Sequence, residues 1–237
     1  MRTHRLYVDM PLAVDSEIQL DKQASHYLGT VLRVKSGQAL NVFNNQGGCY
    51  EAVVQSASKK SVVIKTSSFD PNDRMPLQKL SIAIGVTKGD RMDTVMQKAT
   101  ELGVHGIQPL WMDYCDVKLP KERLEKKLQH WRQITVSASE QSERNRLPEV
   151  LEPQTFDVWL QQIEPSKTLL FHPAGQPPSK LLQPMDSPYF CFGPEGGFSD
   201  REVAMAQGQG VSIISLGERI LRAETAPIVV LASQLLI

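Results

Sequence analysis

The sequence has few cysteines and no long apolar run. Cys49, Cys115 and Cys191 are odd in number, lie far apart and form no C-x-x-C pair. The sequence therefore indicates neither a disulfide framework nor a zinc site, and we expect a reducing compartment and no bound metal. Residues 1–12 carry charges throughout, and no segment is long and apolar enough to span a membrane. We expect a soluble, cytoplasmic protein.

The sequence also has no net charge, with 26 Lys and Arg against 26 Asp and Glu, but the charges are unevenly distributed. Residues 117–146 hold 8 basic and 4 acidic side chains, whereas residues 147–237 hold 5 and 10. The basic segment is suited to contact with RNA phosphates. Lysine and glutamate are interleaved in it, as on an ordinary exposed helix, so both interpretations stay open.

A cluster of Pro, Asp and Asn at residues 70–76 predicts a linker or a tight turn. Before it, short β-rich runs predict a small β-barrel or meander with one helix near residues 23–31. After it, apolar runs alternate with helical patterns, which indicates a parallel sheet covered by helices. The expected strands before the linker are residues 39–43, 50–54 and 62–65; after it we expect strands at 80–86, 107–112 and 168–171 and helices at 90–102 and 121–142.

Two glycine-bearing loops near the C-terminus each follow a short apolar run. Residues 189–192 precede Gly193-Pro194-Glu195-Gly196-Gly197-Phe198-Ser199, and residues 211–216 precede Gly217-Glu218-Arg219-Ile220-Leu221-Arg222-Ala223-Glu224. The runs predict buried parallel strands, and ligands bind at the carboxyl ends of such strands. Ser199 and Glu202 have capping-box spacing, which predicts a helix start. Two ordinary strand-to-helix turns would show the same glycines, so the loops alone do not distinguish a ligand site from ordinary turns.

The chain resembles the ribosomal RNA small subunit methyltransferase E family of the SPOUT superfamily over most of its length. Besides the two glycine loops, the stretches that carry the resemblance are Val31-Leu32-Arg33-Val34-Lys35-Ser36-Gly37, Lys88-Gly89-Asp90-Arg91-Met92, Gln97-Lys98-Ala99-Thr100-Glu101-Leu102-Gly103, Glu140-Gln141-Ser142-Glu143-Arg144-Asn145-Arg146 and Leu169-Leu170-Phe171-His172-Pro173.

The resemblance implies an α/β fold with two domains. A small PUA-like β-barrel that binds RNA is expected at residues 1–72, and a SPOUT trefoil-knot methyltransferase domain with a parallel sheet at residues 73–237. The implied reaction is methylation of N3 of a specific uridine in 16S rRNA by S-adenosylmethionine, in a homodimer that acts on the small ribosomal subunit and holds no metal.

The resemblance also implies roles for particular residues. A guanidinium beside the uracil carbonyls would stabilise the anion that forms when N3 loses its proton, which makes Arg222 the first catalytic candidate. Glu224 is the candidate to hold Arg222 or to accept the proton. Thr225 is expected to cap the last helix or to contact the cofactor. The expected RNA contacts are Arg5, Arg33, Arg144 and Arg146, and the expected cofactor contacts are Leu170, His172 through its backbone, Gly193, Glu195, Gly196, Gly197, Leu216, Gly217, Leu221 and Thr225.

Two other functions stay open from the sequence. One is a different SPOUT enzyme that acts on a tRNA base or a ribose 2′-oxygen, and the other is a noncatalytic RNA-binding or ribosome-assembly factor. The last expected helix, residues 225–236, is apolar on nearly all sides. Such a helix should be buried in a core or at a subunit contact.

Overall fold

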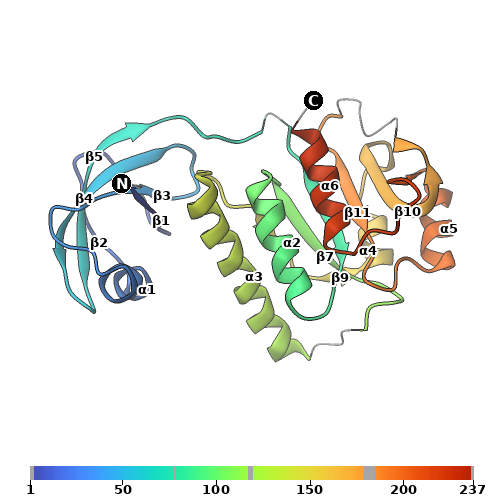
Figure 1. Cartoon of the computed structure of the whole chain (residues 1–237), viewed down its shortest axis with the longest axis horizontal. Coiled ribbons are helices and arrows are strands. Elements are labelled where there is room, and N and C mark those ends of the chain that lie inside the picture. Colours follow the sequence, from blue (N-terminus) through green and yellow to red (C-terminus); the bar gives the residue numbers. More distant parts are fainter. Residues whose placement is uncertain (1–2, 77, 117–119, 179–184, 236–237) are drawn as a thin grey trace. The chain divides into compact units, whose positions relative to one another are not determined.

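The computed structural model describes residues 3–76, 78–116, 120–178 and 185–235 (Figure 1). The chain divides into two compact units. One comprises Met1–Met75 together with Ser139–Leu147, and the other comprises Pro76–Ala138 and Pro148–Ile237. The boundary expected from the sequence, after residue 72, does not account for the segment Ser139–Leu147, whose contacts lie with the first unit.

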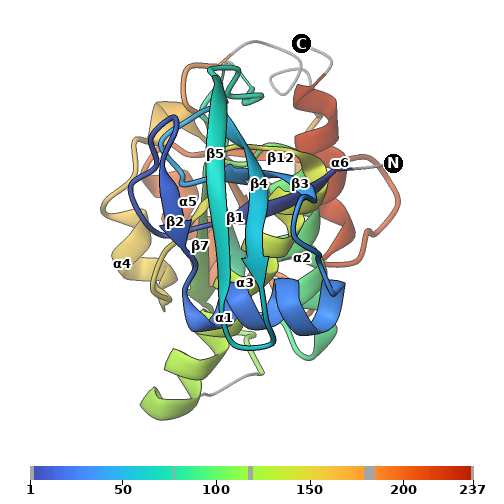
Figure 2. The ribbon, with the colours of Figure 1, turned by 90° about the vertical axis from the view of Figure 1, so that its left-hand side faces the viewer.

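The first unit is built on one mixed five-stranded sheet with the order β1-β3-β4-β5-β2 (Figure 2). β1 and β3 are parallel, and the other neighbouring strands are antiparallel. The three β-rich runs expected before the linker are β3, β4 and β5. The expected PUA-like β fold of this part of the chain is confirmed. The strands are β1 (His4–Tyr7), β2 (Glu17–Gln19), β3 (Ala39–Phe43), β4 (Cys49–Ala57) and β5 (Val62–Asp70).

A short helical segment covers this sheet, as the sequence predicts. It consists of α1 (Lys22–His26), capped by the Asp21 carboxylate, and a π-helical turn η1 (Tyr27–Leu32). Gly29 is required at its position, because a Cβ there would lie 2.2 Å from the Ser58 carbonyl oxygen. Arg33 ends the turn in the left-handed conformation, with φ of 53°. The glycine thus lets η1 pack directly on the turn between β4 and β5.

The second unit has a sheet in which every described strand pairs in parallel with its neighbours, in the order β12-β10-β11-β6-β7-β8, with β9 also paired to β7. The strands are β6 (Ser81–Gly85), β7 (Gly106–Trp111), β8 (Glu149–Val150), β9 (Gln154–Thr155), β10 (Thr168–Gln176), β11 (Tyr189–Phe192) and β12 (Ser212–Ile214). The helices are α2 (Asp90–Glu101), α3 (Lys121–Ser142), α4 (Phe156–Leu160), α5 (Asp200–Gly208) and α6 (Thr225–Gln234), and a 3-10 turn η2 (Pro165–Lys167) precedes β10.

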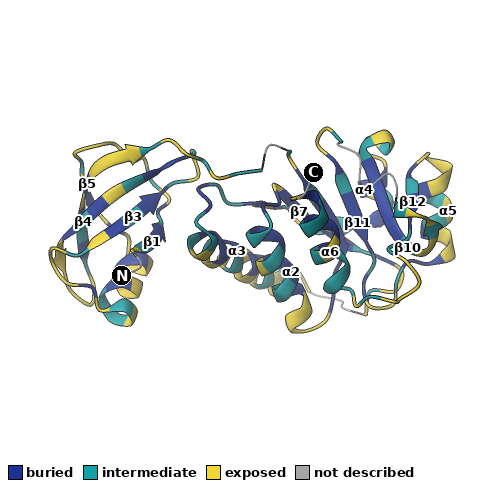
Figure 3. Ribbon diagram, turned by 45° about the horizontal axis from the view of Figure 1, so that its top comes forward, coloured by how far each residue is buried: buried dark blue, intermediate teal, exposed yellow. Residues whose placement is uncertain are grey.

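Helices cover both faces of this sheet (Figure 3). On one face α2, α3 and α6 bury an apolar cluster that includes Met96, Trp131 and Leu231. On the other face α4 and α5 bury a second cluster that includes Trp159 and Ala206. Burial on both faces explains why the central strands are continuous apolar runs rather than alternating ones.

After the edge strand β12 the chain returns to the middle of the sheet, where α6 contacts α2 and β11. The parallel sheet and this return confirm the expected α/β fold of the SPOUT class. Within the single chain the last helix is only partly buried, so the expected burial in a core or at a subunit contact is met on one side. Val230 and Leu231 are buried, but Val229 is 43% and Leu235 52% exposed. Leu236, at the end of the expected helix, lies outside the described residues.

Among the helices that the structure describes, none has both the length and the apolar character needed to cross a membrane.

The predicted capping box at the start of α5 is present and extends to a neighbouring strand. The Glu202 carboxylate is fully buried and accepts hydrogen bonds from the backbone N–H of Ser199 (2.9 Å) and of Asp113 (3.0 Å). The Ser199 hydroxyl accepts from the Glu202 N–H in return. Asp113 follows β7, so one carboxylate fixes both the end of the 193–199 loop and the end of a strand.

Replacing Glu202 with alanine should lower the free energy of unfolding by about 2–4 kcal/mol, because one buried and one partly buried N–H group would lose a charged acceptor. Denaturant titration followed by circular dichroism measures this. Glu125→Ala, on an exposed position of α3, is the control and should change stability by no more than about 0.5 kcal/mol. Equal losses in the two variants would contradict the role given to Glu202.

Candidate active site

A cavity of about 470 Å³ opens at the carboxyl ends of the central strands of the second unit. Residues of β10, the 193–199 loop, the loop before α6 and the start of α2 form most of its wall. The lining residues are Arg91, Phe171, His172, Pro173, Phe192, Gly193, Pro194, Glu195, Gly197, Phe198, Ile220, Leu221, Arg222, Ala223, Glu224 and Ala226. Its size is that of a small-molecule site. Both glycine loops singled out from the sequence therefore contribute to one cavity.

Two aromatic rings from adjacent strands line this cavity. Phe171 of β10 and Phe192 of β11 stack with ring centroids 4.9 Å apart and planes 10° from parallel. Leu170, the predicted contact, belongs to the cluster on the opposite face of the sheet and does not line the cavity. Neighbouring side chains of a strand point to opposite faces. The sequence thus singled out the strand whose residues line the cavity, and the contact expected for Leu170 stays a prediction.

The 193–199 loop depends on its glycines. A Cβ at Gly193 would lie 2.9 Å from the backbone carbonyl carbon of Gly197, and Gly197 itself has φ of +74°. A Cβ at Gly196 would lie 2.7 Å from the Cβ of Tyr114, so Gly196 packs on the loop after β7 and does not line the cavity. The three glycines thus serve a tight turn, a positive φ and a close approach, respectively.

His172 lines the cavity, and its ring makes a hydrogen bond within β10. Its Nδ1 accepts a hydrogen bond of 3.2 Å from the Ala174 backbone N–H. The expectation that the imidazole has no chemical role stays a prediction. Leu216 packs against the large apolar cluster, Gly217 is exposed with φ of +102°, and neither residue lines the cavity.

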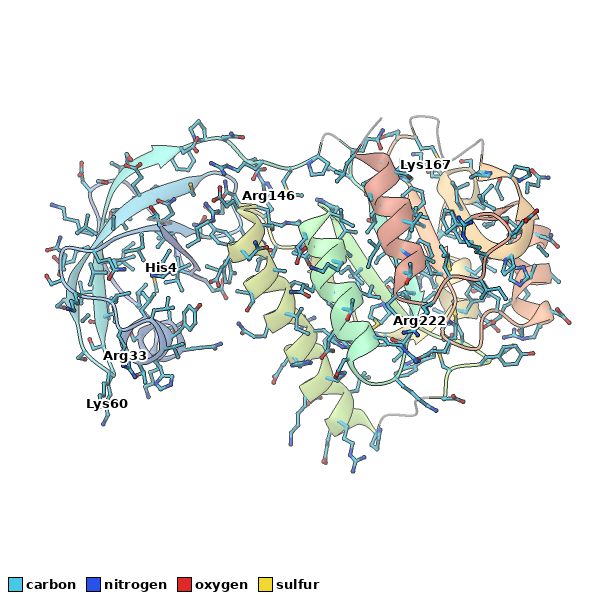
Figure 4. The ribbon with its side chains drawn as sticks, viewed as in Figure 1. His4, Arg33, Lys60, Arg146, Lys167 and Arg222 are labelled. Atoms are coloured by element: carbon cyan, nitrogen blue, oxygen red, sulfur yellow. The ribbon has the colours of Figure 1, made fainter. Side chains whose placement is uncertain are left out.

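Arg222 is exposed and lines the cavity from the loop before α6 (Figure 4). Within the described parts of the chain, its side chain makes no hydrogen bond or ion pair, so the guanidinium is available to a ligand. Thr225 is the first residue of α6 and does not cap it. The N-cap is Glu224, whose side chain makes no capping bond.

Glu224 presents a carboxylate oxygen that is buried without a hydrogen-bond donor, Oε2. Its nearest ion-pair partner is Arg91, whose Nε lies 3.9 Å away. No ion pair joins Glu224 to Arg222 among the described residues. Of the two roles expected for Glu224, proton acceptance therefore fits this geometry better than holding Arg222.

Arg91 is a cavity residue to which the sequence assigned no role. Its Nη1 donates to Oε1 of Glu195 at 2.7 Å, and the Lys88 backbone N–H donates to the same oxygen at 2.9 Å. Burial acts to raise the pKa of Glu195, but these donors and the Glu195 backbone N–H outweigh it and lower the pKa overall. The signal was present in the sequence, since Arg91 lies in one of the stretches that carry the resemblance.

The four arginines expected to contact RNA all belong to the first unit and differ in exposure. Arg144 is 3% and Arg5 9% exposed. Burial lowers the pKa of Arg144 to about 10, although Asp73 acts in the opposite direction. Arg5 donates to the Asn145 side chain and to the Arg144 carbonyl oxygen. The guanidinium of Arg5 is therefore committed to contacts inside the unit.

Arg33 and Arg146 are the more accessible members of this set, and Figure 4 shows Arg33 near Lys60. The Arg146 side chain is 42% exposed and pairs with Asp73. It also donates to the Gln46 carbonyl oxygen at 3.2 Å.

No group of three or more His, Cys, Asp or Glu side chains arranged to hold a metal ion occurs in the portion of the chain that the structure describes.

Comparison with known proteins agrees with this arrangement. Residues 73–234 match the family model of an RNA methyltransferase domain, and residues 20–67 match that of an RNA methyltransferase PUA domain. The ribosomal RNA small subunit methyltransferase E of Synechocystis sp. is 31% identical over 97% of this chain and 76% of its own length. The Bacillus subtilis enzyme of the same name is 31% identical over 88% and 85%.

The chain belongs to the ribosomal RNA small subunit methyltransferase E family. Two solved structures extend the match to the whole fold. A Legionella pneumophila methyltransferase, solved with bound S-adenosylmethionine, has a TM-score of 0.93 and 36% identity over 100% of this chain and 97% of that one. The Neisseria gonorrhoeae ribosomal RNA small subunit methyltransferase E, also bound to S-adenosylmethionine, has a TM-score of 0.91 and 30% identity over 98% and 97%.

Replacing Gly193 with alanine should lower the free energy of unfolding by about 1–3 kcal/mol, because the new methyl group meets backbone rather than a movable side chain. Gly208→Ala is the matched control, since a Cβ at Gly208 has no atom within 4 Å. Thermal unfolding of the two variants compares them. A Gly193 variant as stable as the control would show that the loop relaxes freely.

Proposed function

We propose that this protein methylates N3 of a specific uridine in 16S rRNA, with S-adenosylmethionine as the methyl donor. The observation that supports this most is the unpaired Arg222 guanidinium in a cavity formed by two glycine loops, in a chain of this methyltransferase family. The proposal includes the cytoplasm as the place of action.

The residues of the cavity fit this cofactor. The Phe171 and Phe192 rings offer an apolar surface for adenine, and the 193–197 loop brings backbone N–H and C=O groups close to a ligand. The buried Glu224 oxygen without a donor can accept a hydrogen bond. We propose Leu170, Gly196, Leu216, Gly217 and Thr225, which do not line the cavity, as supports of these loops rather than as contacts.

S-adenosylmethionine supplies an electrophilic methyl group when it is bound. The task of the chain is to make a poor nucleophile reactive, since uracil N3 carries a proton. Arg222 stabilises the negative charge that develops on the uracil carbonyl oxygens, and Glu224 receives the N3 proton. The loops that close around the cavity exclude water and hold the reacting groups in line.

In this proposal the domain of residues 1–72 is the main part of the unit that binds the RNA, and the domain of residues 73–237, apart from the 139–147 segment, carries the reaction. Arg33 and Arg146 contact phosphates, while Arg5 and Arg144 keep the 139–147 segment in place. The target nitrogen lies on the pairing edge of the base. The uridine must therefore be unpaired or flipped out of its helix when it enters the cavity.

The deciding experiment is methyl transfer from labelled S-adenosylmethionine to purified small ribosomal subunits that lack the modification. Mass spectrometry then identifies the nucleoside product. 3-Methyluridine at one site of 16S rRNA supports the proposal. A different methylated nucleoside would assign the chain to another reaction, and the absence of both transfer and cofactor binding would favour a noncatalytic RNA-binding factor.

Arg222→Ala should lower the rate of methyl transfer by about 100-fold or more while cofactor affinity changes little, because the guanidinium acts on the base. Single-turnover kinetics and calorimetric titration with S-adenosylmethionine measure the two effects. Arg219→Ala is the control, since Arg219 is an exposed residue of the same loop that does not line the cavity. Equal losses of rate and of cofactor affinity in the Arg222 variant would show that its role is cofactor binding.

The protein forms a homodimer through α6 in this proposal. Val229 of α6 and Leu235, which follows its last residue, expose apolar side chains, and the helix has no charged residue. Val229→Asp should convert the dimer to a monomer, because the carboxylate would have to be buried in the contact. Light scattering after size exclusion measures the mass. Val158→Asp, at an apolar position of α4 that is 46% exposed, should leave it unchanged, and a monomeric wild-type protein would refute the dimer.

A further inference from the structure

Arg91 reaches carboxylates from two different loops of the cavity. Its Nη1 lies 2.7 Å from Oε1 of Glu195, in the 193–199 loop, and its Nε lies 3.9 Å from Oε2 of Glu224, in the loop before α6. All three residues line the cavity. Within the described residues of the cavity wall, Arg91 is the cationic side chain paired with both loops.

The position of Arg91 is set by its own short segment. The backbone turns at Gly89, with φ of +59°, and α2 begins at the next residue. After this turn is set, the Lys88 backbone N–H donates to Glu195 Oε1 at 2.9 Å, and the Arg91 guanidinium donates to the same oxygen. The Lys88 side chain points elsewhere and pairs with Asp116 at 2.8 Å. Arg91 therefore extends from an anchored turn toward Glu224.

Two like charges that line one cavity repel each other, and a cation between them offsets this repulsion by attracting both. The Glu195 and Glu224 side chains are 28% and 17% exposed, so water screens them only in part. Each carboxylate belongs to a loop rather than to a helix or a strand. A cation that contacts both opposes the repulsion and ties the two loops together.

We propose that Arg91 is a positioning residue of the methyl-transfer site: its charge holds the 193–199 loop and the loop before α6 together and keeps the Glu224 carboxylate aimed into the cavity. This inference rests on the proposed function. Arg91 itself need not touch the substrate. Its effect on the reaction runs through Glu224 and through the neighbouring Arg222.

An ordinary surface ion pair is the competing explanation, since the Arg91 side chain is 46% exposed and exposed pairs contribute little. An isolated pair would be independent of the second loop. The proposed role requires that loss of the Arg91 charge loosen both loops, including the loop before α6, whose Glu224 lies 3.9 Å from Arg91. The two explanations therefore differ in what happens to the loop before α6.

The test uses Arg91→Met, which removes the charge and keeps a long side chain, and Arg91→Lys, which keeps the charge. Lys98→Met is the control, because Lys98 lies on the same helix and pairs with Glu101. Hydrogen exchange of the whole protein without RNA reports on the backbone amides of residues 193–197 and 217–226. Calorimetry gives the affinity for S-adenosylmethionine, and single-turnover assays give the rate of methyl transfer.

In Arg91→Met we expect amide exchange in both loops to be faster by about tenfold, and methyl transfer to be slower by about tenfold or more. Arg91→Lys should recover most of both losses, and Lys98→Met should match the wild type. Unchanged exchange at residues 217–226 in Arg91→Met would overturn the proposal. Failure of Arg91→Lys to recover either loss would also overturn it, because the charge would then not be what matters.

A second variant tests whether the effect of Arg91→Met comes from repulsion between the two carboxylates. Glu195→Gln removes one of the two like charges. Arg91→Met should therefore change amide exchange and the rate of methyl transfer less in the Glu195→Gln background than in the wild type. Fully additive effects would contradict the inference. If the wild-type protein methylates no RNA, the proposed function fails, while the exchange measurements still decide whether Arg91 joins the two loops.

Discussion

The parallel pairing of β10 with β11 on one side and β12 on the other is the constraint on which the rest of the site depends. Leu170 is opposite Cys191 in one ladder and Ile213 in the other. Because the three strands run in the same direction, their carboxyl ends lie at one edge, where residues of β10 and the loops after β11 and β12 line the cavity. A register slip of one residue would exchange Phe171 with Leu170 and remove an aromatic ring from the cavity.

The elements that the sequence located best are those whose own residues carry the signal. The bounds of β3, α3 and β11 agree with the prediction to the residue, because β-rich or helical runs with clear ends specify them. β1, β2, β8 and β9 were not predicted. Each has four residues or fewer, and what makes β1 a strand is its pairing with β3, more than thirty residues away. Pairing at such a distance leaves no local pattern.

The site shows the same division between local and distant causes. The glycine loops could be found from the sequence because a tight turn before a helix requires particular residues, whereas Arg222 was assigned through the resemblance to the family. The aromatic lining could not, because the face to which a strand side chain points depends on the sheet around it. Arg91 was quoted in a motif without a role, since the carboxylates that it pairs with lie more than a hundred residues away along the chain.

The buried arginines of the first unit show why charge along a sequence is a weak guide to an RNA surface. Burying a guanidinium costs free energy unless its hydrogen bonds are satisfied. Arg144 donates to the Arg146 carbonyl oxygen, and Arg5 donates through Nη2 to Asn145, although the Arg5 Nε is buried without an acceptor among the described residues. Asn145 in turn donates to the Asn72 carbonyl oxygen at 2.7 Å. These bonds tie the 139–147 segment to the first unit. Arg144 of the basic segment and Arg5 of β1 therefore fix the architecture, and the affinity for RNA has to come from the residues that this architecture leaves exposed.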